Sequence, residues 1–201
     1  MDASVLTAHV DELCRRARPA ARALANTSDR DRRSALLAAA DAIATAALTI
    51  IAANAEDLTQ AGADGLSAAL IDRLRLDGDR LPSLVRDLRA VAELPDPVAR
   101  VLERRTIAQG IAMEKIAVPL GVIAIIFESR PNVTVDAASL CVRSGNACIL
   151  RGGKEAARSN RALANAFRAG LRHSAVPEDA VQLVQEQDRA LVPLLLSPDA
   201  T

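Results

Sequence analysis

Apolar side chains recur at three- and four-residue spacing through the first hundred residues, which is the pattern of amphipathic helices. The elements it predicts are, in order, a helix bent or interrupted at Pro19, a long helix from about Asp29 to Ala61, a short helix after Ser67 and a helix over about 79–93. Thr27 and Ser28 are suitable caps for the long helix. We expect its core-facing positions to be Leu36, Leu37, Ala40, Ile43, Leu48 and Ile51.

The pattern changes at the double proline of residues 95–97. Partial alternation of apolar and polar residues over 98–103 and 111–116, around Gly110, predicts an antiparallel hairpin. The segment 118–127 follows as a continuous apolar run rich in β-branched residues, which is typical of a strand buried on both faces.

Helix and strand patterns alternate through the remainder of the chain. The predicted elements are a helix from Asn132 to about Ser144, a strand at 147–151, a helix over 155–170, a strand at 181–184 and a helix that begins near Arg189. This β-α-β-α-β order predicts an α/β fold, in which a helical N-terminal segment precedes a parallel sheet with right-handed crossovers. Strand 181–184 is expected to be an exposed edge. The buried face of the helix from Asn132 is expected to hold Val133, Ala137, Leu140 and Cys141.

Charge and composition argue against several classes of function. The chain has 25 Lys and Arg residues against 25 Asp and Glu residues, and a net charge of zero argues against a general nucleic-acid binder. Phe127 and Phe167 are its sole Phe, Tyr or Trp residues, which argues against a base-stacking surface. No apolar run reaches the roughly 18 residues that span a bilayer, and Asp11, Glu12 and Arg15 interrupt any secretory signal. We expect a soluble, cytoplasmic protein without a nucleic-acid or membrane partner.

The cysteines and histidines indicate neither a disulfide framework nor a metal site. Cys14, Cys141 and Cys148 form no close pair, and neither histidine has a cysteine at ligand spacing. Cys141 and Cys148 are expected to be small core residues, while Cys14 lies on an exposed helix without a positioned base. None of the three is a predicted nucleophile.

Candidate chemistry gathers where the predicted parallel strands end, which is where open sheets of this kind bind ligands. The segments are 128–132, 151–155 and 185–188. The most informative is Arg151-Gly152-Gly153-Lys154, because glycines permit a tight turn and a close approach of the backbone to a ligand. The following helix would add free N–H groups and its positive dipole end, which together predict a simple phosphate site.

That turn is neither of the common phosphate-binding loops. Cys148 stands where a Walker loop needs its first glycine, and Glu155 replaces the Ser or Thr. A tight turn with solvated basic residues is an alternative of equal weight.

Three side chains after the first strand are candidates for a substrate site. Asn132 is either a helix cap or an amide that stabilises an oxyanion. Arg130 suits a carboxylate or phosphate substrate. Glu128 is either a further residue of that substrate site or the partner of Arg130 or Lys154 in an ion pair.

Two stretches of the sequence, 118–140 and 144–156, closely resemble the gamma-glutamyl phosphate reductases, also called glutamate-5-semialdehyde dehydrogenases. The runs Glu-Ser-Arg-Pro-Asn and Arg-Gly-Gly-Lys-Glu within them are very specific to that family. Shorter matches occur in the same order at 54–58, 65–74, 96–98 and 188–192. The family belongs to the aldehyde dehydrogenase superfamily, which implies a Rossmann-like sheet. The implied divisions are a helical part of the cofactor domain at 1–97, a portion of an oligomerisation flap at 98–117 and the first half of the NADPH-binding domain at 118–201.

The resemblance also implies an activity. The family reduces L-glutamyl 5-phosphate with NADPH to glutamate 5-semialdehyde and phosphate in proline biosynthesis. Its nucleophilic cysteine lies in a later segment, beyond the position of Thr201, so no catalytic residue is assigned here. A non-catalytic nucleotide-binding or dimerisation module is the alternative. The resemblance further implies a homo-oligomer, with glutamate 5-kinase as a possible pathway partner.

Particular residues acquire roles from the same resemblance. Lys154 stands where relatives that prefer NAD carry an acidic residue, and a lysine would attract the 2′-phosphate of NADPH. Arg151 is similar to the lysine that lies near that ribose in the superfamily. The expected cofactor-binding residues are Arg151, Gly152, Gly153, Lys154 and Glu155. The expected substrate or oxyanion residues are Glu128, Ser129, Arg130 and Asn132, with either Arg130 or Asn132 beside the acyl phosphate.

Overall fold

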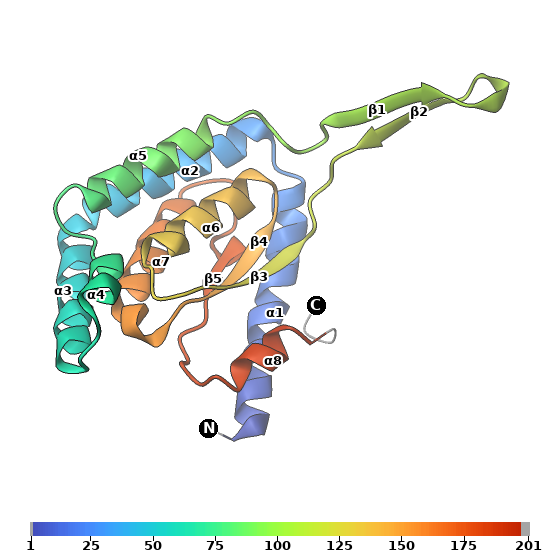
Figure 1. Cartoon of the computed structure of the whole chain (residues 1–201). Coiled ribbons are helices and arrows are strands. Elements are labelled where there is room, and N and C mark those ends of the chain that lie inside the picture. The colour runs from blue at the N-terminus through green and yellow to red at the C-terminus, as the bar shows by residue number, and fades with distance from the viewer. Residues whose placement is uncertain (1, 198–201) are drawn as a thin grey trace.

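The computed structural model describes residues 2–197, and its centre is the predicted parallel sheet (Figure 1). The strands β3 (Val122–Ile126), β4 (Ala147–Arg151) and β5 (Val181–Leu183) lie in the order β3-β4-β5, and both pairs are parallel. The predicted α/β class and β-α-β-α-β order are confirmed.

Helices cover both faces of this sheet. The helices are α1 (Ala3–Ala25), α2 (Asp29–Thr45), α3 (Ala47–Ala63), α4 (Ala68–Leu74), α5 (Arg80–Ala92), α6 (Asn132–Arg143), α7 (Ala157–Leu171) and α8 (Leu191–Leu195). Cys148 and Leu150 of β4 pack into the core formed with α2, α5, α6 and α7, whereas Ile149 packs with α1 and α8. Successive strand residues point to opposite faces, so β4 is buried on both sides.

Both outer strands of the three-stranded sheet, β3 and β5, pair on one side only among the described residues. β5 is an edge strand as expected, but its side chains are buried, since Val181 packs into the core with α7 and Val184 packs against α1. β3 pairs with β4 alone within residues 2–197, and Val122–Ile126 is at most partly buried. The prediction of a first strand buried on both faces is therefore wrong, whereas 181–184 is an edge strand as predicted, with buried rather than exposed side chains.

The predicted long helix is two helices. α2 and α3 meet at Ala46 with an angle of 67° between them. The Thr45 hydroxyl donates to the Asp41 carbonyl oxygen at 2.8 Å, a contact of the kind that bends helices. The bend rotates the buried face, so that Ile50 is buried and Leu48 is 86% exposed.

Two smaller expectations about helices also need correction. Ile51 is exposed like Leu48, and on α6 Leu140 is 53% exposed although Cys141 is buried as predicted. Pro19 does not interrupt α1, which continues through it to Ala25.

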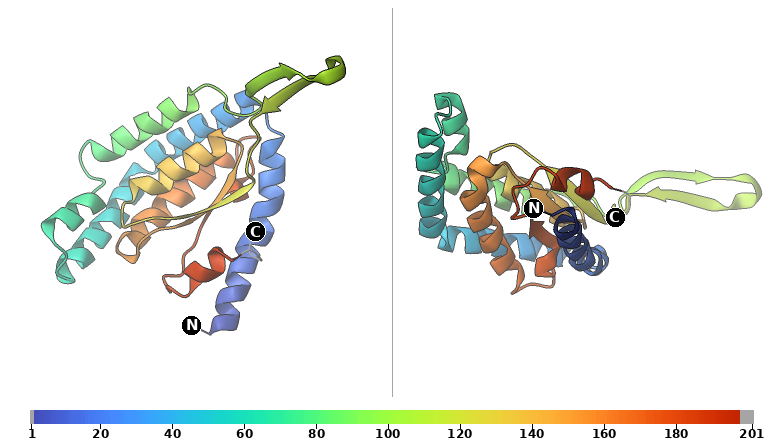
Figure 2. Two further views of the ribbon diagram at one scale, coloured as in Figure 1. Left: turned by 45° about the vertical axis from the view of Figure 1, so that its right-hand side comes forward. Right: turned by 90° about the horizontal axis from the view of Figure 1, so that it is seen from below.

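The predicted hairpin is confirmed and projects away from the body (Figures 1 and 2). Strands β1 (Val101–Thr106) and β2 (Ala112–Ile116) pair antiparallel, and every residue of β1 is exposed. Its base is anchored by Arg32, which is 2% exposed and donates to both Asp96 carboxylate oxygens at 2.7 and 2.8 Å. Within the described residues no single helix is long and apolar enough to cross a membrane, and only the bent pair α2 and α3 meets that test jointly.

A buried polar network joins the helical half to the sheet half. Asp57 of α3, 2% exposed, accepts from the Ser159 N–H at 2.8 Å and the Ser159 hydroxyl at 2.7 Å, at the start of α7. One turn earlier Asn54 donates to the Leu74 carbonyl oxygen at 2.7 Å and accepts from the Leu76 N–H at 2.9 Å. α3 therefore fixes both the start of α7 and the end of α4.

Replacing Asp57 with Asn should destabilise the protein by about 2–4 kcal/mol, because an amide turns one acceptor into a donor facing the donors of Ser159. Urea unfolding of the purified variant measures the change. The matched control is Glu56→Gln, since the Glu56 side chain is 67% exposed and its ion pair with Arg158 should contribute less than about 1 kcal/mol. Equal losses in the two variants would contradict the capping role of Asp57.

Candidate functional site

The turns after β3 and β4 lie side by side and open on a common pocket. The Phe127 N–H donates to the Arg151 carbonyl oxygen at 3.0 Å, which fixes one turn against the other. The pocket has a volume of about 370 Å³. Its apolar wall consists of Leu66, Leu70, Leu74 and Phe127, and its polar wall of Arg73, Glu128, Ser129, Arg151, Gly153 and Glu155. The structure thus brings together five of the nine predicted site residues.

Glycine is required at two positions of the β4 turn by internal packing. A Cβ at Gly153 would lie 2.0 Å from Ser129 Oγ, and one at Gly152 would lie 2.2 Å from Asn160 Nδ2. No real contact is that short, so these glycines permit the close approach of neighbouring protein groups. Their contact with a ligand stays a prediction.

Ser129 and Glu155 are joined across the two turns. The Ser129 hydroxyl donates to Glu155 Oε2. Partial burial acts to raise the pKa of Glu155, but the hydrogen bond from Ser129, the Glu155 N–H and the charges of Lys154 and Arg189 outweigh it, so the pKa is lowered. Glu155 is therefore ionised at neutral pH, and its carboxylate holds the turn in place.

Arg151 is the cation that the fold places at the junction of the strand ends. Its Nη2 donates to the Gln187 carbonyl oxygen at 3.3 Å, which connects β4 to the segment after β5. Its Nε is buried and has no hydrogen-bond partner among the described residues. A buried guanidinium N–H without an acceptor leaves a position that an anionic ligand would satisfy.

The start of α7 does not offer the free N–H groups that the sequence predicted. A short 3₁₀ turn, Lys154–Ala156, precedes α7, and the carboxylate of Asp57 already accepts from the N–H groups of Ser159 and Arg158. The helix dipole is thereby satisfied within the protein. The expectation of free N–H groups at this helix end is wrong for Arg158 and Ser159, whereas phosphate binding at the turn stays a prediction.

The predicted substrate residues are divided between two places. Asn132 is the first residue of α6 rather than its cap, and its amide donates to Asp136 Oδ2 at 2.9 Å. It lines a separate pocket of about 230 Å³ beside Arg73, Arg75 and Arg80.

Glu128 is exposed and lies 3.4 Å from Arg73 Nη1 and 3.7 Å from Arg130 Nε. It pairs with Arg130, as one of the two interpretations had it. Arg73 was not identified from the sequence, because only the packing of α4 over the strand ends brings it to both pockets.

The cysteines lie away from these pockets. Cys14, Cys141 and Cys148 are all buried, at 6%, 5% and 0% exposure, and none is disulfide-bonded. The expected core role of Cys141 and Cys148 is confirmed, whereas Cys14 is not on an exposed face. Burial raises the pKa of the Cys14 thiol, and contact with Cys141 together with burial raises the pKa of Cys148. Among residues 2–197 no group of three or more His, Cys, Asp or Glu side chains could hold a metal ion.

Comparison with known proteins finds similar curated proteins named gamma-glutamyl phosphate reductase. No protein-family model matches the chain. It is 52% identical over 182 residues to the gamma-glutamyl phosphate reductase of Rhizorhabdus wittichii, covering 90% of this chain and 42% of the relative. The enzyme of the same name from Sphingopyxis alaskensis is 53% identical over 187 residues, covering 93% and 44%. The chain thus spans less than half the length of these relatives.

Solved structures of other proteins have the same fold as this chain. The gamma-glutamyl phosphate reductase of Thermotoga maritima superposes with a TM-score of 0.88 at 34% identity, over 91% of this chain and 44% of that one. A probable aldehyde dehydrogenase from Listeria monocytogenes superposes with a TM-score of 0.72 at 14% identity, over 98% of this chain and 40% of that one. The latter likeness shows a shared fold and no more.

Gly153→Ala should destabilise the protein by about 1–3 kcal/mol, because the added methyl group overlaps Ser129 Oγ. Gly62→Ala is the matched control: its Cβ would meet nothing within 4 Å in α3, so a gain of about 0.5–1 kcal/mol is expected. Adding Ser129→Ala to Gly153→Ala should restore part of the loss. Urea unfolding measures all three, and a Gly153→Ala protein as stable as the parent would show that the turn is not tightly packed.

Proposed function

From its homology to gamma-glutamyl phosphate reductases, we propose that the chain forms cofactor-binding structure of a reductase that uses NADPH to convert L-glutamyl 5-phosphate into glutamate 5-semialdehyde and phosphate. The observation that carries this proposal is the β4 turn, where Arg151 has a buried Nε without an acceptor beside the pocket at the strand ends.

The residues of that turn fit an anionic nucleotide. Lys154 is exposed and makes no ion pair or side-chain hydrogen bond among residues 2–197. The Lys154 ammonium and the Arg151 guanidinium, which belong to the same turn, would attract the 2′-phosphate and ribose end of NADPH, whereas a carboxylate in place of Lys154 would repel it. Gly152, Gly153 and Glu155 shape the turn that presents both cations.

NADPH would supply the hydride, and the described residues would bind and orient it. Arg151 and Lys154 would hold its phosphate end, and the Ser129–Glu155 hydrogen bond would keep their turn rigid. The apolar wall around Leu70 and Phe127 would exclude water from the pocket.

A doubly charged acyl phosphate would bind best where cations converge. Asn132 lines a pocket in which three arginines face two carboxylates, the charged lining being Arg73, Arg75, Arg80, Asp87 and Asp136. Arg130 lies exposed against Glu128. This favours Asn132 over Arg130 as the group beside the acyl phosphate, with the arginines supplying the charge.

The projecting hairpin supports the further proposal that the protein is a homo-oligomer. Leu102, Ile111 and Ile116 are 49%, 55% and 47% exposed on an element that makes little contact with the body. Exposed apolar side chains on an isolated hairpin indicate a surface that another chain covers. The same observation favours the alternative function, a dimerisation module without catalysis.

Lys154→Glu should weaken NADPH binding by about 30- to 1,000-fold and leave NADH much less affected, because the change removes one charge-assisted contact and adds a repulsion of similar size. Calorimetric titration of both nucleotides at fixed ionic strength measures it. Arg151→Ala should act in the same direction with a smaller effect.

The chain has one other lysine, Lys115 on the exposed hairpin strand β2, and Lys115→Glu is the matched control that should change neither affinity. If Lys154→Glu weakens NADPH and NADH equally, Lys154 is a solvated turn residue and the cofactor assignment fails.

The 201-residue chain by itself should have no reductase activity, because all three of its thiols are buried and the pKa values of Cys14 and Cys148 are raised. NADP⁺ reduction dependent on both semialdehyde and phosphate tests this. Turnover that survives dialysis and disappears in Cys148→Ser would contradict the expectation.

A further inference from the structure

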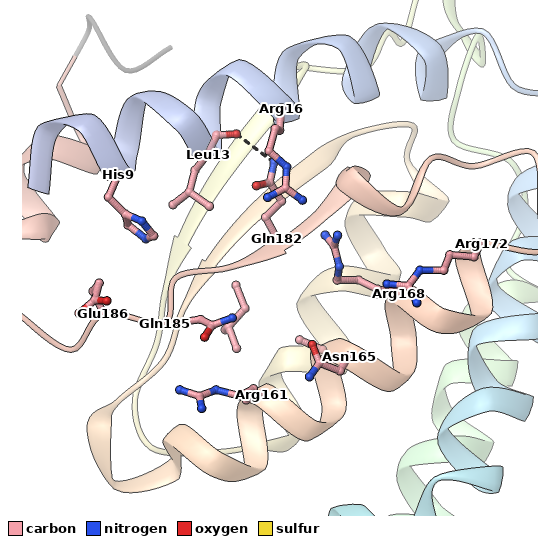
Figure 3. Close-up of a pocket in the computed structure, with 12 residues that line it drawn as sticks. His9, Leu13, Arg16, Arg161, Asn165, Arg168, Arg172, Gln182, Gln185 and Glu186 are labelled. Carbon is pink, nitrogen blue, oxygen red and sulfur yellow. Dashed lines mark hydrogen bonds between the residues drawn. The ribbon is translucent and has the colours of Figure 1, made fainter. Parts of the chain in front are cut away.

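A further hollow, separate from the pocket at Arg151, lies beside β5. It has a volume of about 390 Å³ and is enclosed by α1, α7 and the end of β5 (Figure 3). We call it the β5 groove. It shares no lining residue with the pocket at the strand ends. The proposed function uses none of its residues.

The side-chain amide of Gln182 lines the β5 groove, and its hydrogen bonds fix its orientation. Gln182 is 2% exposed, and its Nε2 donates to the Leu13 carbonyl oxygen at 2.9 Å and to the Asp179 carbonyl oxygen at 3.4 Å. Two carbonyl oxygens can be satisfied only by the NH₂ group, so the amide cannot be flipped. Gln182 Oε1 is consequently buried without a donor among residues 2–197.

Positive charge surrounds this unsatisfied acceptor. Four arginines line the β5 groove against one lining carboxylate, Glu186. Three of the four are already paired: Arg16 and Arg168 with Asp179, and Arg172 with Glu178. Arg161 has neither an ion pair nor a side-chain hydrogen bond among the described residues.

The opposite wall carries a second unpartnered group. His9 of α1 faces the hollow across from the α7 residues, as Figure 3 shows, and its Nε2 is buried without a hydrogen bond. Two helices that meet through packed apolar residues would not leave an imidazole nitrogen and an amide oxygen unsatisfied on the same cavity. Such groups are satisfied by a polar ligand.

We propose that the β5 groove binds a phosphomonoester that carries hydroxyl groups. The phosphate contacts Arg161, the one lining arginine that is not already paired, and a hydroxyl group donates to Gln182 Oε1. A phosphate supplies charged acceptor oxygens for the Arg161 guanidinium, which the other lining arginines, already paired with Asp179 and Glu178, do not need. The volume of the groove suits a sugar phosphate.

Two sources could present this chemistry. We assign the groove to a free sugar phosphate, since the phosphate-bearing ribose of NADPH is already assigned to the β4 turn and is the competing source. A small cavity lined by Gly152, Arg161 and Gln185 adjoins the groove on the side of that turn.

Ribose 5-phosphate and adenosine 2′-monophosphate are the probes, titrated calorimetrically into the 201-residue chain, with ribose as the uncharged comparison. Saturable binding of ribose 5-phosphate and none of ribose is expected. Arg161→Ala should weaken it by about 10- to 100-fold and Arg161→Glu by more. Arg105→Ala removes an exposed arginine of the hairpin and should have no effect. Arg161 is itself exposed, and an unchanged urea transition verifies that its variants are folded.

The source of the phosphate follows from which of the two ligands binds and which variants lose that binding. Ribose 5-phosphate that binds together with NADPH, and is insensitive to Lys154→Glu, supports a separate sugar-phosphate site whether or not the NADPH proposal holds. Adenosine 2′-monophosphate as the sole ligand, lost in both the Arg161 and the Lys154 variants, shows that the phosphate belongs to the dinucleotide at the β4 turn and overturns a separate sugar-phosphate site. Binding of neither phosphate, or equal affinity in the parent and Arg161→Ala, overturns the proposal.

Discussion

The buried carboxylate of Asp57 is the constraint on which the arrangement of this protein depends. A desolvated carboxylate must be hydrogen-bonded, and its donors lie at the start of α7, a hundred residues further along the chain. Because Asn54, one turn earlier, holds the end of α4, a single helix sets both α7 and α4. The pocket at the strand ends follows from this, since α4 supplies one wall and the turn before α7 supplies the other.

The hydrogen bonds to Asp57 also limit which groups of the protein are left to bind an anion. With two of its N–H groups given to Asp57, the start of α7 has fewer free donors for an anion, and we expect charged side chains to do more of the binding. Arg151 and Lys154 provide charge on one side of the β4–α7 unit, and Arg161 provides it on the other. Unsatisfied buried atoms mark both places: Arg151 Nε at the turn and Gln182 Oε1 in the β5 groove.

Apolar side chains outside the core are exposed at two places. One is the hairpin, which is anchored at its base by the buried Arg32–Asp96 pair and is otherwise free of the body. The other is the open edge of β3, where Ile126 is 39% exposed. Apolar exposure of this kind indicates surfaces for association, and the curated relatives are longer than this chain.

The sequence by itself determined the α/β class, the order of strands and helices, the hairpin and the concentration of charge at the strand ends, because periodicity and turn residues are local properties. It could not determine the break between α2 and α3, since a continuous helical pattern does not reveal a bend that packing and the Thr45 hydroxyl impose. The exposure of β3, the capping of α7 by Asp57 and the approach of Arg73 to the site were decided by tertiary structure alone. Each depends on residues distant in sequence whose burial requires a partner that only the folded chain brings within reach.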